Sequence, residues 1–450
     1  MIKNETVRIT VNDITAEGAG VGRYEGMAVF VPHTAVGDVI DAKIVKINKN
    51  YAYGIIDKII TSSDTRIPVD CPSFYKCGGC VFRHINYKSE LEIKENRVRE
   101  TLKRIAGADI KSGGIVGADN TFAYRNKAQF PFSANGSTGF FAPRSHRVIP
   151  ISECPLLPDE FGGIAACVSE FLRENNISVY NEESGRGLAR HLYIRKGAVS
   201  GEIMVVLVIN GDTLPRFKAL TDKLLSLCGE SLKSVQLNIN KKRTNVILGD
   251  KNKVIFGAPY ITDTLCKIKI RISPFTFYQI NHDMAEKLYK KAGEYAEPKG
   301  KNIIDLYCGA GSIGLSLCDR AKSVTGVEIV PEAVEDAKEN ARINGIDNAG
   351  FICDDAKTAA KTLAERGVHA DTVIIDPPRK GCEEELLHTI AEDFSPERIV
   401  YVSCDPATLA RDIKILLSLG YTAEEFTAFD MFPRTGHVEC VTLMTRKEAD

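Results

Sequence analysis

From about residue 300 onward, short apolar segments alternate with longer segments that are apolar on one face. In the helical segment that begins at Pro331, the side chains of Val334, Ala337 and Ala341 share one face, and Gly345 suits its end. The short apolar segments predict strands at 302–306, 323–328, 350–353, 372–376, 398–403, 425–430 and 438–444. This alternation predicts an α/β fold with a doubly wound, Rossmann-like, mainly parallel sheet whose ligand site lies at the carboxyl ends of the strands.

The first 60 residues have a different pattern, in which short strands are separated by turns that contain glycine. The strands are expected at 6–11, 27–31, 39–46 and 54–60, and this spacing is typical of a small β-barrel. A charged helix is expected at 88–106, and the following stretch mixes strands, most clearly 201–210, with helices such as 215–227. The pattern therefore predicts three parts: a barrel at 1–60, a central α+β domain at 61–270 and the doubly wound domain at 271–450.

The composition is that of a globular protein, with 44% hydrophobic and 26% charged residues in 450. The longest apolar run, 203–209, is far shorter than the ~20 residues that cross a bilayer, so we expect a soluble, cytoplasmic protein. Residues 1–150 hold 21 Lys and Arg against 15 Asp and Glu, and the remainder holds 37 against 44. A basic front that interleaves lysines with Tyr51 and Tyr53 is compatible with RNA binding, although solvated charges and packed strand tyrosines explain it as well.

The first strand of the doubly wound part runs into a turn with Gly309, Gly311 and Gly314, which lets the backbone approach a ligand closely. Glu328 ends the next strand, where its carboxylate can accept both hydroxyls of a ribose. The glycine spacing also fits the fingerprint of a dinucleotide fold. Asp355 and the motifs further along the chain argue against NAD as the ligand of this site.

Reactive side chains follow the fourth and fifth strands. Asp376 precedes two prolines and Arg379, and Cys404 directly follows the strand at 398–403. A cysteine at a strand end is often an inert core residue. Beside a methyl donor, however, a thiolate can add to carbon 6 of uracil so that carbon 5 becomes nucleophilic, and a base must then remove the carbon 5 proton. Glu439, in a late segment that a doubly wound sheet can place beside the fifth strand, is the candidate base.

Taken together, these motifs resemble the RNA (uracil-5-)-methyltransferases: 305–311, 376–381, 401–406, 432–439 and the segment 273–281 ahead of the sheet. The resemblance covers essentially the whole chain. It implies that Cys404 is the nucleophile, that Glu439 is the proton acceptor, and that residues 1–60 form an RNA-binding TRAM domain. It also implies an S-adenosyl-L-methionine pocket lined by Gln279, Tyr307, Ser312, Glu328, Asp355 and Asp376.

Thirteen cysteines in a long chain without secretory features make a disulfide framework improbable. Cys71, Cys77 and Cys80 have the spacing C-x5-C-x2-C, and Cys154 is the expected fourth thiolate. On ligand type alone, four cysteines suit zinc and a [4Fe–4S] cluster equally. The resemblance implies the [4Fe–4S] cluster of the ribosomal RNA branch, and therefore 23S ribosomal RNA as the partner of a monomeric enzyme.

Two alternatives stay open at this point: a methyltransferase of the transfer RNA thymine loop, and a non-catalytic iron–sulfur assembly factor that binds RNA. The chain also departs from its apparent relatives at two positions. Arg83 stands where a glutamine is common after the third cysteine, and Asp405 stands where an asparagine commonly follows the nucleophile. A carboxylate that pointed at the thiol would disfavour its ionisation.

Overall fold

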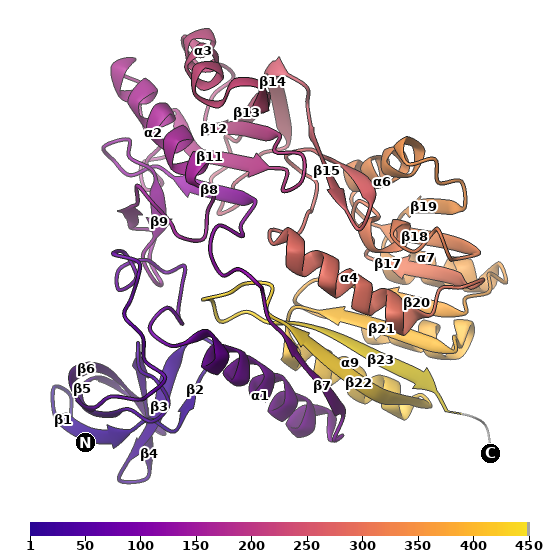
Figure 1. Cartoon of the computed structure of the whole chain (residues 1–450), viewed down its shortest axis with the longest axis horizontal. Helices are drawn as coiled ribbons and strands as arrows, with labels where there is room; N and C mark the ends of the chain where they lie inside the picture. The colour runs from indigo at the N-terminus through magenta and orange to yellow at the C-terminus, as the bar shows by residue number, and fades with distance from the viewer. Residues whose placement is uncertain (448–450) are drawn as a thin grey trace.

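Six short strands form the N-terminal sheet of the computed structural model, which describes residues 1–447. They are β1 (Thr6–Thr10), β2 (Asp13–Ile14), β3 (Ala19–Tyr24), β4 (Met27–Pro32), β5 (Val39–Ile47) and β6 (Tyr51–Thr61). The order β1-β5-β6-β4-β3-β2 curls the sheet around a small core of valine, isoleucine and alanine side chains (Figure 1). The predicted N-terminal barrel is confirmed as this half-barrel sheet.

Strand β3 was not predicted, because its two glycines resemble turn residues in the sequence. The structure shows a packing reason for them. A side chain at Gly20 would lie 1.9 Å from Thr34 Oγ1, and one at Gly22 would lie 2.8 Å from the Ile9 side chain. These glycines let β3 lie close against its neighbours, so the expected turn ends before Ala19 and a strand begins there.

The central part is built on a five-stranded sheet with the order β14-β13-β12-β11-β8. Its strands are β8 (Lys127–Pro131), β11 (Ala189–Lys196), β12 (Ile203–Ile209), β13 (Leu232–Ile239) and β14 (Lys251–Gly257). Helices α2 (Asp159–Glu174) and α3 (Phe217–Cys228), the latter followed by the short 3-10 helix η1 (Gly229–Ser231), cover one face with apolar side chains. The hairpin of β9 (Gly139–Phe141) and β10 (Val148–Pro150) adjoins this sheet.

The C-terminal sheet has eight strands in the order β19-β18-β17-β20-β21-β23-β22-β7. They are β17 (Asn302–Leu306), β18 (Ser323–Glu328), β19 (Ala349–Cys353), β20 (Thr372–Ile375), β21 (Arg398–Ser403), β22 (Tyr421–Phe429), β23 (Glu439–Arg446) and β7 (Lys111–Val116). The predicted doubly wound, mainly parallel sheet is confirmed, since β23 alone runs antiparallel to its neighbours. β7 comes from much earlier in the chain and pairs in parallel with β22 at the sheet edge.

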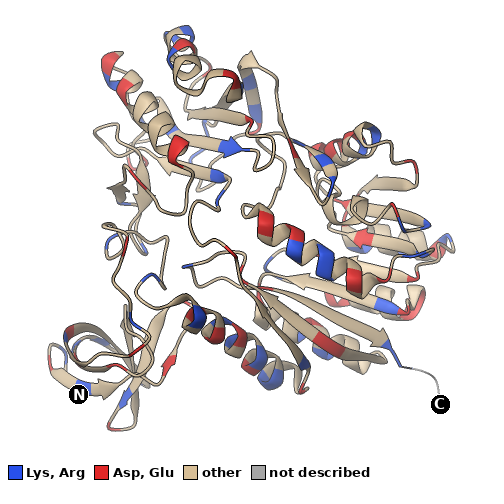
Figure 2. Cartoon of the chain, viewed as in Figure 1, with Lys and Arg blue, Asp and Glu red and all other residues tan. Residues whose placement is uncertain are grey.

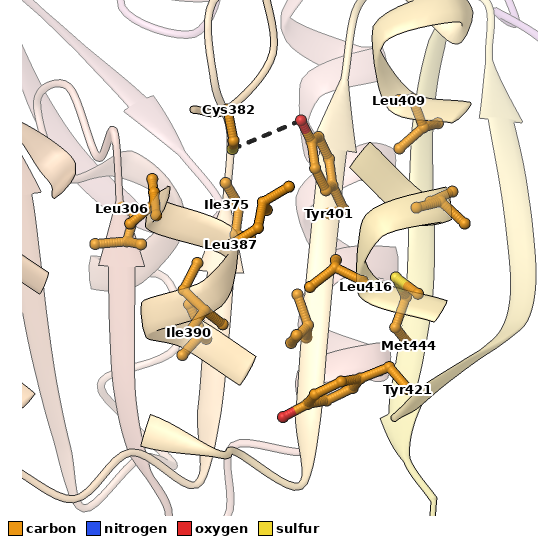
Figure 3. Close-up of a cluster of buried hydrophobic side chains, with 14 of the residues drawn as sticks. Leu306, Ile375, Cys382, Leu387, Ile390, Tyr401, Leu409, Leu416, Tyr421 and Met444 are labelled. Atoms are coloured by element: carbon orange, nitrogen blue, oxygen red, sulfur yellow. Dashed lines mark hydrogen bonds between the residues drawn. The ribbon is translucent and has the colours of Figure 1, made fainter. Parts of the chain in front are cut away.

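Helices cover both faces of this sheet. On one face lie α1 (Tyr87–Ala106), α7 (Ala356–Glu365), α8 (Glu384–His388) with the π-helical turn η2 (Thr389–Phe394), and α9 (Pro406–Ser418). Figure 3 shows the apolar side chains that join α8 and α9 to the strands. On the other face lie α4 (His282–Ala296), α5 (Ser312–Leu315), α6 (Pro331–Ile343) and the hairpin of β15 (Ile261–Leu265) and β16 (Ile268–Ile272).

Helix α1 links the N-terminal sheet to the C-terminal one, and capping residues stand at both of its ends. The Asn86 side chain accepts a hydrogen bond from the Ser89 amide at its start, and Gly107 adopts a left-handed conformation at its end. Along the helix, acidic and basic residues alternate (Figure 2). Within residues 1–447, none of the helices combines the length and the apolar character needed to cross a membrane.

Candidate active site

Cys404 and Glu439 come together because the strands that carry them are neighbours. Cys404 directly follows β21, and Glu439 is the first residue of β23. The two strands are antiparallel, and their pairing ends with Ser403 opposite Cys440, so Cys404 and Glu439 are each one residue beyond the same pair. The charge of Glu439 acts on the Cys404 thiol, which shows that the two groups are close. Glu439 is buried, whereas Cys404 is half-buried. A thiol and a carboxyl group thus share one space at the carboxyl end of β21.

Burial and acidic neighbours raise the pKa of both groups. Burial, with the negative charges of Glu439 and Asp376, raises the pKa of Cys404 to about 11. Burial and the nearby Asp376 also hold the pKa of Glu439 well above its usual value. Desolvation raises the pKa of Asp376 to about 7. The guanidinium of Arg379 opposes the shifts of both Cys404 and Glu439. The sequence assigned Arg379 no role, although a cation next to two prolines at a strand end was the available signal.

The carboxylate of Asp405 is directed away from the thiol. Its Oδ1 accepts hydrogen bonds from the Ala407 amide at 2.9 Å and the Thr408 amide at 3.0 Å, so it caps the start of α9. A carboxylate in this position is stabilised by the first turn of the helix. The acids that raise the pKa of Cys404 are instead Glu439 and Asp376.

The glycine turn after β17 is held by two carboxylates. Glu328 accepts hydrogen bonds from the Gly309 amide at 3.1 Å and the Val330 amide at 2.8 Å. Asp305, which is buried inside β17, accepts one from the Gly314 amide at 2.9 Å, and its other oxygen has no partner. Burial raises the pKa of Asp305 to about 7. The sequence marked Asp305 as part of a motif without seeing that it fixes this turn.

The other predicted pocket residues lie around the same strand ends. Tyr307 stands in the turn with a left-handed backbone, φ 64°. Ser312 begins α5, and its hydroxyl lies 3.0 Å from the Tyr289 hydroxyl of α4. Gln279 is buried just ahead of α4. Asp355 follows β19 and caps α7 by accepting a hydrogen bond from the Lys357 amide at 3.1 Å.

The four predicted ligand cysteines line a single cavity. Cys71, Cys77 and Cys80 lie between β6 and α1, Cys154 lies between β10 and α2, and all four border a space of about 660 Å³. Burial raises the pKa of Cys80 to about 12, and the charges of Cys154 and Cys77 add to this shift, whereas Arg83 opposes it. Within residues 1–447, no three His, Cys, Asp or Glu side chains are close enough to share one metal ion. The four thiols therefore border one cavity, in which Cys71, Cys77 and Cys80 come from one segment of the chain and Cys154 from another.

Arg83, where the chain departs from its apparent relatives, is buried beside the cysteines. Its Nε and Nη2 donate to the two carboxylate oxygens of Asp70 at 2.6 and 2.7 Å. This paired geometry neutralises the buried cation and satisfies two of its three nitrogens, whereas Nη1 has no partner among residues 1–447. His84 is also buried, and its Nε2 lies 2.9 Å from the Thr34 carbonyl of the N-terminal sheet. The segment that carries three of the cysteines is thus attached to the barrel.

Family models match almost all of the chain. The model described as tRNA (Uracil-5-)-methyltransferase matches residues 86–447, and the TRAM domain model matches residues 3–56. The chain belongs to the RNA uracil-5-methyltransferase family. This methyltransferase is an enzyme that uses S-adenosyl-L-methionine, binds RNA and carries an N-terminal TRAM domain.

Similar proteins align with the methyltransferase over almost its full length. Uncharacterized RNA methyltransferases of Bacillus cereus and Clostridium acetobutylicum are each 43% identical to it, and each alignment covers 99% of this chain and 98% of the relative. The crystal structure of the Pyrococcus abyssi tRNA (uracil-54, C5)-methyltransferase with S-adenosyl-L-homocysteine is similar with a TM-score of 0.79 and 29% identity. That match covers 98% of this chain and all of the other.

Proposed function

We propose that this methyltransferase modifies carbon 5 of uridine in 23S ribosomal RNA, with Cys404 as nucleophile and Glu439 as proton acceptor. The observation that supports this chemistry is the pairing of β21 with β23, which ends one residue before Cys404 and beside Glu439, together with the effect of the Glu439 charge on the Cys404 thiol. Uracil needs both groups. Its carbon 5 is a poor nucleophile until a thiolate has added to carbon 6, and a base must afterwards remove the carbon 5 proton.

The proposed reaction has three steps: addition of the thiolate, methyl transfer and elimination. The thiolate of Cys404 adds to carbon 6, and the electron pair of the carbon 5–carbon 6 double bond becomes available at carbon 5. Carbon 5 then takes the methyl group that S-adenosyl-L-methionine supplies, which leaves S-adenosyl-L-homocysteine. Finally the carboxylate of Glu439 accepts the carbon 5 proton, the double bond re-forms, and the carbon 6–sulfur bond breaks to release the thiolate.

The methyl donor is proposed to lie along the strand ends that carry the remaining predicted residues. Glu328, held by the Gly309 and Val330 amides, would accept the ribose hydroxyls. The proposed pocket also includes Gln279, Tyr307, Ser312, Asp355 and Asp376. Replacing Glu328 with glutamine should weaken binding of S-adenosyl-L-homocysteine in a calorimetric titration. Unchanged affinity would remove Glu328 from the pocket.

Trapping the covalent intermediate tests the chemistry. RNA that contains 5-fluorouridine should form a denaturation-stable adduct with the protein, because the fluorine at carbon 5 cannot leave as a proton does. Cys404→Ala should abolish this adduct. Glu439→Gln should still form it but should lose turnover on ordinary RNA. An adduct that forms equally well in Cys404→Ala would show that the proposed nucleophile is wrong.

For the cysteine cavity we propose a [4Fe–4S] cluster held by Cys71, Cys77, Cys80 and Cys154. Four cysteines that border one cavity are compatible with such a cluster, and the resemblance to the ribosomal RNA branch favours it over zinc. The cluster would be structural, because the cavity lies apart from Cys404 and shapes the segment that joins the barrel to α1. Protein purified without oxygen should contain about four irons per chain. One zinc and no iron would overturn the proposal.

The choice of RNA rests on the resemblance to the ribosomal RNA branch, which the TRAM domain and the four cysteines support. The alternative is transfer RNA, which the similar Pyrococcus abyssi enzyme supports, since that enzyme is a tRNA (uracil-54, C5)-methyltransferase. Methylation of purified, unmodified 23S ribosomal RNA and transfer RNA by the enzyme, which we propose to be a monomer, separates the two. Product on transfer RNA alone would overturn the ribosomal assignment.

The three predicted parts, 1–60, 61–270 and 271–450, are proposed to divide the work between RNA binding, cluster binding and catalysis. On the barrel, the rings of Phe30, Tyr51 and Tyr53 lie within 5.8 Å of one another, and the Arg144 guanidinium lies 6.0 Å from the Tyr53 ring. Aromatic rings with a cation suit unstacked RNA bases. Tyr53→Ala should therefore weaken RNA binding without changing the affinity for S-adenosyl-L-homocysteine, and unaltered RNA affinity would speak against this role.

A further inference from the structure

The loop between β22 and β23, residues 430–438, leads directly into Glu439. It is called the 430–438 loop below. It has no regular secondary structure of its own apart from turns, so its shape depends on what it contacts. Its first residue is fixed to the sheet edge, where the Asp430 amide donates to the Val116 carbonyl of β7 at 3.0 Å.

One face of α1 contacts this loop over about two helical turns. The Lys94 ammonium donates to Asp430 at 2.6 Å and to Glu90 at 2.7 Å. Glu90 in turn accepts a hydrogen bond from the Arg434 amide at 2.6 Å. One turn further along the helix, Arg97 donates to the Gly436 carbonyl at 2.6 Å. The helix therefore holds the loop at its beginning, middle and end.

The charged groups in this contact are buried and balanced. Glu90, Lys94 and Asp430 are 0% exposed, and the Arg434 guanidinium lies 3.4 Å from Glu90. Two cations thus face two carboxylates that are shielded from solvent. A buried network of this kind is a poor source of stability compared with apolar packing, but it tolerates one geometry and strongly disfavours others.

The other parts of the chain reach the same loop. The Val81 and Phe82 amides, which follow the cysteine Cys80, donate to the Arg434 carbonyl at 2.8 and 3.1 Å. At Gly436, a side chain would lie 2.0 Å from the Ala16 carbonyl of the barrel. The loop is thus the place where the barrel, the cysteine segment and α1 meet the strand that begins with Glu439.

We propose that the network of Glu90, Lys94, Arg97, Asp430 and Arg434 is a positioning device for Glu439, and that it governs removal of the carbon 5 proton rather than attack by Cys404. This inference rests on the proposed function. The separation follows from the order of the chain. Glu439 pairs with Phe429 in the sheet but is the first residue after the 430–438 loop, whereas Cys404 follows β21 and belongs to another segment. Displacing a base from its hydrogen-bonding position slows proton transfer and leaves earlier steps intact.

The test compares two rates in Lys94→Met and in the milder Arg97→Gln. With 5-fluorouridine RNA, the rate of adduct formation reports attack and methyl transfer and should stay within about threefold of the parent rate. With ordinary RNA, turnover should fall about 10–100-fold, which is the usual scale for a misplaced catalytic group. The covalent intermediate should then accumulate on ordinary RNA, where the parent enzyme shows little.

Arg398→Met is the matched control, since it removes a cation from an ion pair with Glu297 (2.6 Å) at the opposite end of β21. It should change neither rate, and thermal unfolding of each variant shows that the protein is folded. Equal losses of adduct formation and turnover in both loop variants would mean a merely structural network and would overturn the proposal, as would two unchanged rates. Absence of any adduct in the parent enzyme would instead overturn the proposed function.

Discussion

The rate at which Cys404 attacks uracil should depend steeply on pH. Its pKa of about 11 lies far above neutrality because of burial and the charges of Glu439 and Asp376. The thiolate is the reactive form, and at pH 7.5 a thiol of that pKa is ionised in about one molecule in 3,000. The pKa is raised, so the reactive fraction grows as the pH rises, by about tenfold for each unit below the pKa.

The assay is the rate of adduct formation with 5-fluorouridine RNA, with S-adenosyl-L-methionine and RNA both saturating. Between pH 6.5 and 8.5 this rate should increase about 100-fold. Arg379→Gln should lower the rate at each pH, because Arg379 opposes the rise of the thiol pKa. Asp405→Asn is the control and should leave the profile unchanged, since asparagine also caps helices. A rate that is flat across this range would refute the reasoning, because the thiol would then already be ionised in the complex.

Three further predictions concern the scaffold. Gly436→Ala would bring a methyl group to 2.0 Å from the Ala16 carbonyl, so thermal unfolding should show a loss of about 1–3 kcal/mol, and an unchanged Tm would contradict the close contact. Gly314→Ala would place its Cβ 2.8 Å from Asp305 Oδ2, and the displaced turn should bind S-adenosyl-L-homocysteine at least tenfold more weakly in calorimetry, the usual scale for a contact worth about 1.4 kcal/mol. Cys80→Ser should remove most of the iron that elemental analysis finds in the parent protein, and full retention would exclude Cys80 as a ligand.

Much of the C-terminal sheet could be predicted because its local signals and its tertiary structure agree. The strands at 302–306, 323–328 and 398–403 have the predicted bounds, and α6 begins at the predicted Pro331. Their apolar segments are buried on both sides, so hydrophobicity alone marks them. β7 lacks such a signal because it contains two adjacent glycines and is held by pairing with β22, more than 300 residues away in the sequence.

For the site, the sequence could predict which side chains meet at the strand ends, since parallel sheets gather them there. The predicted position of the Glu439 segment beside the fifth strand is confirmed by the pairing of β21 with β23. The buried network was not predictable. Glu90 and Lys94 lie in a helix rich in charges, which is typical of a solvated surface, and only the distant Asp430 makes Lys94 a buried residue.

The charges of the site also decide between the two nucleoside ligands that the glycine spacing allowed. In a dinucleotide fold, the amides at the start of a long helix face the pyrophosphate. Here α5 has four residues, and the Gly314 amide is already bonded to the buried Asp305. Burial raises the pKa of Asp305 and of Asp376 to about 7, so a further negative charge beside these desolvated groups would be unfavourable. The pyrophosphate of a dinucleotide would add negative charge at this end of the sheet, whereas the positive sulfonium of S-adenosyl-L-methionine would offset it. The electrostatics therefore favour the same ligand as the family to which the chain belongs.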